Sequence, residues 1–123
     1  MIWLAIAIGG ATGSLARYLV SVAVFQLYGE VVPLAVAVVN ILGCFIAGLG
    51  VGAATTGHWL PSETTRAFVF VGILGGFTTF SSFGLDTFNL IRDGRLLVAG
   101  VNAIGQLIVG VAALYCGYAL IAR

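Results

Sequence analysis

The sequence predicts an all-α integral membrane protein with four transmembrane helices, forming one domain over residues 1–123. Hydrophobic residues make up 61% of the chain and charged residues only 7%, and the mean hydropathy is +1.17. Soluble domains carry roughly a quarter of their residues as Asp, Glu, Lys or Arg. Five basic and four acidic residues are too few to cover a water-soluble fold of this length. A net charge of +1 also offers no phosphate-neutralising patch, which argues against nucleic acid as a partner.

Charged residues and helix breakers divide the chain into four apolar segments, each near the roughly 20 residues that a bilayer-spanning helix requires. We expect these spans at about residues 2–28, 33–56, 67–91 and 96–122. A polar connection at 57–66 joins the second and third spans, and a short turn at 92–95 joins the third and fourth. Four spans and three short connections leave no room for a second domain.

Glycines recur four residues apart, the spacing at which membrane helices approach closely. The pairs are Gly9 with Gly13, Gly48 with Gly52, and Gly72 with Gly76. This pattern predicts tight helix packing and says nothing of function. Cys44 and Cys116 also lie within spans, where we expect them to act as small packing residues.

The third span contains the most informative stretch, residues 72–86, with the sequence GILGGFTTFSSFGLD. Two adjacent glycines followed by four hydroxyl residues disfavour a continuous helix. We therefore expect a break near mid-membrane, which frees backbone carbonyls to act as ion ligands. The alternative is a continuous helix whose glycines admit a neighbouring helix.

Several side chains within the spans have two interpretations each. Phe80 and Phe83 share one helical face, either for packing or to present positive ring edges to a small anion. Asn40 either donates to an anion or forms an interhelical hydrogen bond. Asn102 and Gln106 lie four apart and form a polar stripe that lines a path or joins helices.

Arg17 and Asp86 are the two charges within the spans, and such residues are functional candidates because they are costly in a membrane. Arg17 lies well inside the first span, whereas Asp86 lies about a turn and a half before Arg92, near the expected interface. An ion pair, or Arg17 bonding to the C-terminal end of a helix, is an equally good explanation. His58 and Trp59, in the polar connection, are expected at the membrane interface.

The basic residues outside the spans do not favour one orientation. Four spans place Arg66 and Arg123 on one side of the membrane, and Arg92 and Arg95 on the other. Cytoplasmic loops normally carry the excess of Lys and Arg. Either a single charge decides the orientation, or the chain inserts both ways and pairs as a dual-topology antiparallel homodimer.

Three motifs together resemble the CrcB/Fluc family of fluoride channels. They are GGATGSLARY at 9–18, Val39-Asn40 with Gly43, and GGFTTFSSF at 75–83, and the resemblance covers essentially the whole chain. It implies an antiparallel homodimer in the microbial plasma or inner membrane. Such a dimer is not an enzyme. It exports fluoride passively and so lowers cytoplasmic fluoride.

The resemblance also implies roles for individual residues. It places Phe80, Phe83 and Asn40 on the fluoride pathway, with Ser81 as a hydroxyl lining. It implies a structural Na⁺ at the dimer interface, bound by the backbone carbonyls of Gly75 and Thr78. Further lining candidates are Arg17, Thr79, Ser82, Asn102 and Gln106.

Three positions depart from the family pattern. Residues 35–37 (AVA) lack a hydroxyl that relatives often carry, Ser82 replaces a Thr, and Asp86 stands where Glu is common. The alternative function is a small proton-coupled multidrug antiporter, which also has four spans. Such an exchanger needs an embedded carboxylate early in the chain, and the first span contains none. A non-transporting helper subunit would explain the glycines but not the hydroxyl-rich third span.

Overall fold

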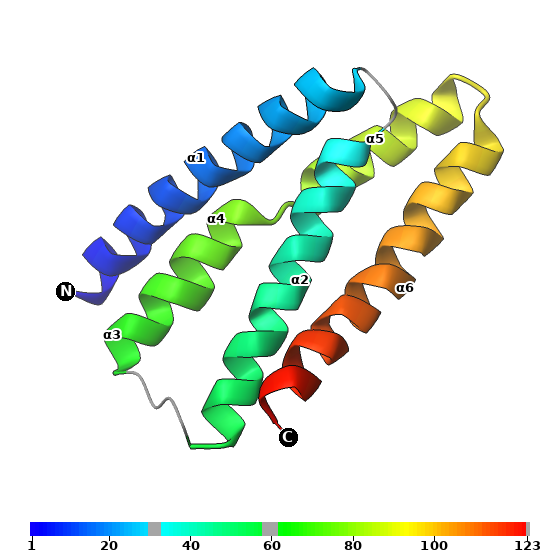
Figure 1. Ribbon diagram of the computed structural model, residues 1–123. Coiled ribbons are helices and arrows are strands. Elements are labelled where there is room, and N and C mark those ends of the chain that lie inside the picture. The colour runs from blue at the N-terminus through cyan, green and yellow to red at the C-terminus, as the bar shows by residue number, and fades with distance from the viewer. Residues whose placement is uncertain (30–32, 58–61, 123) are drawn as a thin grey trace.

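The computed structural model describes residues 1–29, 33–57 and 62–122, and all regular structure in these ranges is helical (Figure 1). His58, Trp59 and Arg123 lie outside the described residues. The elements are α1 (Ile2–Tyr28), α2 (Leu34–Thr55), α3 (Glu63–Arg66), η1 (Ala67–Leu74), α4 (Gly75–Phe77), α5 (Phe80–Arg92) and α6 (Leu96–Ile121).

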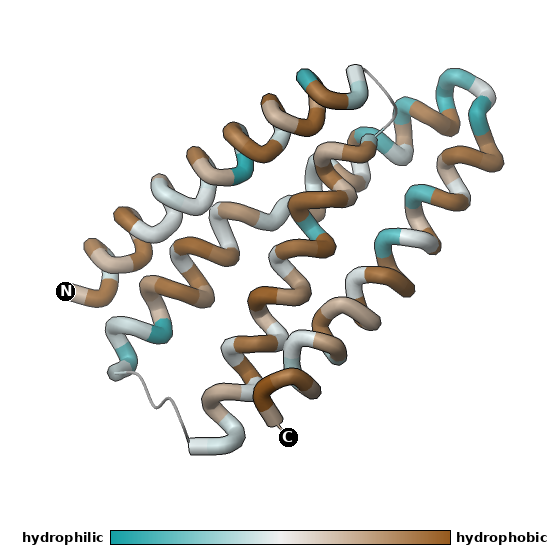
Figure 2. Tube along the Cα trace, viewed as in Figure 1, coloured by the Kyte–Doolittle hydropathy of each residue, from teal (hydrophilic) through white to brown (hydrophobic). Residues whose placement is uncertain are grey.

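Within the described ranges, four helical segments are long and apolar enough to cross a membrane. Their lengths are 27, 22, 30 and 26 residues, and the third runs from Glu63 to Arg92 through α3, η1, α4 and α5. The predicted count of four spans is therefore confirmed. Figure 2 shows hydrophobic residues along all four, with hydrophilic residues gathered at the α5–α6 turn.

The third span begins earlier than predicted, at Glu63 rather than Ala67. The Ser62 side chain caps this helix by accepting a hydrogen bond from the Thr65 N–H at 3.2 Å. Glu63 lies in the first turn, where its charge favours the positive end of the helix dipole. Polarity at 63–66 thus marks a capped helix start, and the prediction that these residues belong to the connection is wrong.

The π-helical stretch η1 connects α3 to α4 without a gap. Hydropathy does not distinguish a π-helix from an α-helix, so the sequence could not predict it. Such stretches are rare and occur often near functional sites. Here η1 leads directly into the segment that ends at the break.

Glycines allow two pairs of helices to approach closely. α1 packs against η1 and α4, and α2 packs against α6 (Figure 1). A Cβ atom added to Gly13 would collide with the Ile73 carbonyl, and one added to Gly48 would collide with the Leu114 carbonyl. The predicted packing role of the glycine pairs is confirmed at these contacts.

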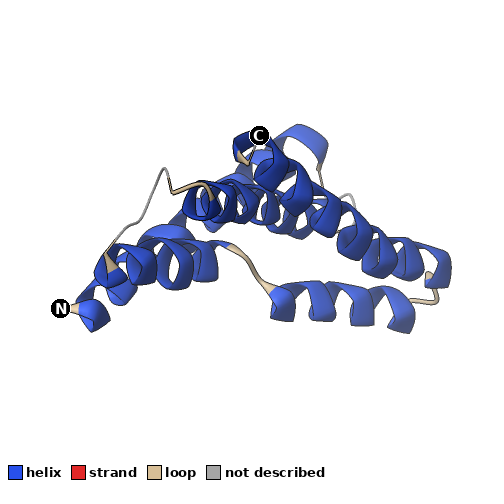
Figure 3. Ribbon diagram, turned by 90° about the horizontal axis from the view of Figure 1, so that it is seen from below, coloured by secondary structure: helices blue, strands red, loops and turns tan. Residues whose placement is uncertain are grey.

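The third span contains a non-helical loop, which Figure 3 shows between its two halves. Beyond the loop, α5 packs mainly against α6. Buried apolar residues are few and include Val39, Leu74 and Phe77, whereas Leu97 is 82% exposed. Outward apolar side chains of this kind suit contact with lipid or with another protein chain.

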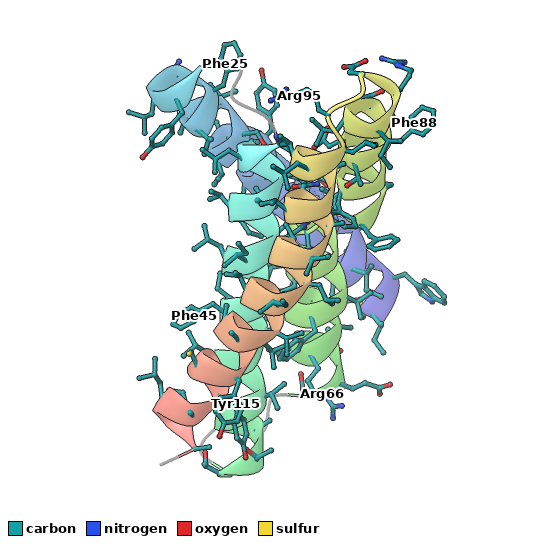
Figure 4. All side chains as sticks on the ribbon, turned by 90° about the vertical axis from the view of Figure 1, so that its right-hand side faces the viewer. Phe25, Phe45, Arg66, Phe88, Arg95 and Tyr115 are labelled. Carbon is teal, nitrogen blue, oxygen red and sulfur yellow. The ribbon has the colours of Figure 1, made fainter. Side chains whose placement is uncertain are left out.

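The described arginines other than Arg17 lie at opposite ends of the helices. Arg66 is at one end and Arg95 is at the other (Figure 4). Arg92 shares the α5–α6 end and forms an exposed ion pair with Asp93 at 3.5 Å.

Candidate functional site

The helix break lies at Thr78 and Thr79, where the backbone is extended. The φ and ψ angles are −80° and 158° at Thr78, and −152° and 111° at Thr79. Gly75 and Gly76 lie within α4, with Gly75 at φ −63° and ψ −35°. The predicted break is confirmed, but it follows the glycine pair instead of falling on it.

Hydroxyl side chains stabilise both ends of the break. The Thr78 hydroxyl donates to the Leu74 carbonyl at 2.9 Å, at the end of α4. The Thr79 hydroxyl accepts from the Ser82 N–H at 3.2 Å and thereby caps the start of α5. Thr79 Oγ1 also contacts the hydroxyls of Ser81 at 3.3 Å and Ser82 at 3.0 Å. The four hydroxyl residues therefore terminate one helix and begin the next.

Asn40 of α2 holds the extended backbone in place. Its Oδ1 accepts from the Thr79 N–H at 2.9 Å, and its Nδ2 donates to the Thr79 carbonyl at 3.2 Å. Nδ2 also donates to Gln106 Oε1 at 3.1 Å. The interhelical hydrogen bond that the sequence suggested for Asn40 is confirmed, and both amide protons have protein acceptors.

The break leaves the two proposed sodium ligands without their helical partners. In a continuous helix, the Gly75 carbonyl would accept from the Thr79 N–H, and the Thr78 carbonyl from the Ser82 N–H. These donors instead bind Asn40 Oδ1 and Thr79 Oγ1. Two backbone oxygens are thereby released from the helical pattern.

Arg17 of α1 reaches the C-terminal side of α4. Its Nη1 donates to the Thr78 carbonyl over 3.4 Å, a long hydrogen bond. This is the helix-end contact that the sequence suggested for Arg17. Asp86 forms no ion pair within the described part of the chain, so the suggested ion pair between these two charges is absent there.

A chain of hydrogen bonds continues from Asn40 across α6 to α5. Gln106 Nε2 donates to Asn102 Oδ1 at 2.7 Å, and Asn102 Nδ2 donates to Thr87 Oγ1 at 2.9 Å. The Thr87 hydroxyl then donates to the Phe83 carbonyl at 2.8 Å. The predicted polar stripe joins helices, and it includes Thr87, which was not predicted although it lies four residues after Phe83.

A cavity of about 300 Å³ lies beside the break. The residues that line it are Asn40, Cys44, Thr78, Thr79, Phe80, Phe83, Gln106 and Leu107. The predicted pathway residues Asn40, Phe80 and Phe83 are thus brought together. Ser81 and Ser82 do not line the cavity but bond to Thr79, which does. Asn102 is likewise bonded to a lining residue, Gln106. Gly75 lies in α4, before the break, and is exposed.

Phe80 and Phe83 lie close to each other at this cavity. Their ring centroids are 5.5 Å apart, and the rings are tilted by 38°. Phe80 is 83% exposed in the single chain, so it is not a core packing residue here. Cys44 lines the same cavity and also faces Gly110 of α6, in keeping with its predicted packing role. Its position on the cavity was not predicted.

The fold and site define a four-helix integral membrane protein with a discontinuous span, a feature that recurs at the ion sites of membrane transport proteins. Residues 4–118 match the family described as CrcB-like protein, Camphor Resistance (CrcB). The chain therefore belongs to the CrcB family, and it is a multi-pass protein of the cell membrane.

Individual relatives match over nearly their whole length. The fluoride-specific ion channel FluC of Opitutus terrae is 47% identical over 118 residues, covering 95% of this chain and 89% of the relative. The protein of the same name from Solibacter usitatus is 42% identical over 123 residues, covering 100% and 99%. That of Solidesulfovibrio magneticus is 44% identical over 115 residues, covering 94% and 91%.

Proposed function

We propose that this chain is a fluoride-specific ion channel through which fluoride leaves the cell passively, so that cytoplasmic fluoride falls. The observation that carries the proposal is the 47% identity, over 95% of the chain, to a protein named a fluoride-specific ion channel. The cavity at the break offers a physical route, because Asn40, Phe80 and Phe83 meet there at mid-span.

The chemistry of this cavity suits the passage of a small anion. The edge of an aromatic ring carries partial positive charge, so the Phe80 and Phe83 rings can attract fluoride edge-on. Neither ring is a strong hydrogen-bond donor that would trap the ion. Conduction requires sites that are favourable enough to enter and weak enough to leave. Two aromatic edges beside amide and hydroxyl groups meet both requirements.

A proton-coupled antiporter fits the chain less well. It would need an embedded carboxylate that alternates between a proton and a cationic substrate. No Asp or Glu occurs in α1, and Asp86 of the third span is not among the residues that line the cavity. The three relatives named above are fluoride-specific ion channels.

We further propose that the channel is an antiparallel homodimer. Irregular backbone at membrane depth is tolerated when it is buried in protein or lines a wet cavity. In the single chain, Phe80 next to the break is 83% exposed and Gly75 is exposed as well. A second copy inserted in the opposite orientation would cover this surface. By the sequence, Arg66 and Arg123 fall on one side of the spans and Arg92 and Arg95 on the other, and this equal count permits both orientations.

We also propose that Gly75 and Thr78 bind a structural Na⁺ through their carbonyl oxygens. These two oxygens suit Na⁺, which is a hard cation that favours oxygen ligands. Neither carbonyl accepts the N–H hydrogen bond that a continuous helix would give it. Bound there, the ion would supply fixed positive charge that favours anions nearby. Thr78→Ser retains the carbonyl and should preserve a Na⁺-dependent rise in thermal stability. Equal stabilisation of the parent by Na⁺ and by a large organic cation would contradict the site.

The function is tested by measuring anion efflux from liposomes that contain the purified protein. We expect fluoride to leave rapidly and chloride to be retained, with protein-free liposomes as the control. Chloride efflux at the same rate as fluoride would remove the claim of selectivity. No efflux of either anion from a monodisperse preparation would refute the channel proposal.

A further inference from the structure

Gln106 lines two neighbouring spaces in the structure. The first is the cavity of about 300 Å³ at the break. The second is a groove of about 260 Å³ between α2 and α6, lined by residues that include Leu34, Ile41, Val98 and Asn102. Gln106 lines both, and among the residues that the structure describes no other is shared between them. The Gln106 side chain can therefore reach either space.

The break determines which way the amides of Asn40 and Gln106 face. The Thr79 N–H needs an acceptor, so Oδ1 of Asn40 faces it and Nδ2 faces the Thr79 carbonyl and Gln106. Gln106 therefore presents its carbonyl oxygen to Asn40 Nδ2, at 3.1 Å. Its Nε2 is then directed at Asn102 Oδ1, at 2.7 Å.

The Gln106 oxygen occupies the place that an anion at Asn40 would take. Asn40 Nδ2 has two protons, and the Thr79 carbonyl accepts one of them at 3.2 Å. The other points to Gln106 Oε1, which is a partially negative acceptor on a long, half-buried side chain. The Thr79 bond holds the break together, so the bond to Gln106 is the one that fluoride can replace.

We propose that Gln106 is a positioning residue that competes with fluoride for the Asn40 amide. Fluoride entering the cavity displaces Oε1, and the Gln106 side chain withdraws toward the groove while its Nε2 keeps the bond to Asn102. When fluoride moves on, Oε1 returns and satisfies Asn40 again. The competition weakens fluoride binding at this station and speeds its release. This inference rests on the proposed channel function.

The test compares two Gln106 variants by their fluoride currents in planar bilayers over a range of fluoride concentrations. Gln106→Met removes the competing acceptor at similar length, so the half-saturating fluoride concentration should fall. Loss of one competing neutral hydrogen bond predicts a decrease of about fivefold. Gln106→Glu retains an oxygen acceptor for Asn40, so the half-saturating concentration should not fall. Ile108→Met, on the exposed face of α6, is the control for a Met on this helix.

The outcomes separate this inference from the proposed function. If the parent protein carries no fluoride current, the channel proposal itself fails. If the parent conducts but Gln106→Met leaves the half-saturating concentration unchanged or raises it, Gln106 is a structural tie and the inference alone is overturned. Should Gln106→Met not purify as a monodisperse protein, Gln106→Ala removes the same acceptor and is held to the same expectation.

Discussion

Replacing Asn40 with Ala should destabilise the helix break. The substitution removes the acceptor of the Thr79 N–H at 2.9 Å and the donor to the Thr79 carbonyl at 3.2 Å. It also removes the donor to Gln106 Oε1. Thr79 is only 8% exposed, so its backbone groups cannot readily exchange the lost partner for water.

The size of the effect follows from these two backbone groups. Each buried polar group left without a partner costs about 1–3 kcal/mol, which gives about 2–6 kcal/mol for both. Interhelical hydrogen bonds in membrane proteins average only about 0.6 kcal/mol, which sets a lower limit of roughly 1 kcal/mol for the pair. We therefore expect Asn40→Ala to lower the free energy of unfolding by about 1–6 kcal/mol.

The assay is denaturant unfolding in detergent micelles, together with fluoride efflux and size-exclusion chromatography. The variant should remain folded, because the damage is local, but fluoride efflux should fall strongly. Asn89→Ala is the matched control, because the Asn89 side chain forms no hydrogen bond within the described ranges. An Asn40→Ala protein with parental stability and parental efflux would show that Asn40 neither braces the break nor serves the pathway.

Three further predictions address the rings, the helix contacts and the topology. Phe80→Leu and Phe83→Leu should give folded proteins, because apolar substitutions of similar volume usually cost under about 1.5 kcal/mol of stability. Fluoride efflux should fall strongly, because Leu has no positive ring edge to attract the anion. Efflux at the parental rate in both variants would show that the two rings serve packing alone. Gly13→Ala should cost about 1–3 kcal/mol in thermal or denaturant unfolding because its Cβ meets the Ile73 carbonyl, whereas Gly10→Ala, in open space, should be neutral or stabilising. Equal effects of both would contradict the packing argument. Three Lys residues added after Arg123 should force one orientation and abolish activity unless an oppositely biased copy is co-expressed. Full activity of the biased chain alone would exclude the antiparallel dimer.

Much of the fold could be predicted because each span is a long apolar segment bounded by charges. Hydropathy averages over many residues, so the prediction of the four spans does not depend on any single residue. The start of the third span was less predictable, because Ser62 and Glu63 suit both a polar loop and a capped helix. The break was predicted from composition, but its position depends on Asn40 of another span, which turns the Thr79 N–H away from the helix.

The candidate site could be predicted only in part. Individual polar and aromatic residues stand out in an apolar chain, and Asn40, Phe80 and Phe83 do meet at one cavity. Their partners depend on how separate helices are placed. Thr87 is an ordinary helix residue until Asn102 of α6 is beside it, and Cys44 is an ordinary packing residue until the break opens a cavity next to it.

The break brings one guanidinium and two released carbonyl oxygens to the middle of an apolar structure. Arg17 places a guanidinium on the Thr78 carbonyl, which also borders the cavity. A Na⁺ on the same oxygen would repel this guanidinium, and the 3.4 Å bond is long enough for Arg17 to yield. Either cation would make the potential beside Thr78 and Phe80 more favourable to an anion than to a cation. Under the proposed function, a cation on the Thr78 carbonyl would therefore set the sign of the permeant ion, and the ring edges of Phe80 and Phe83 would keep its binding weak.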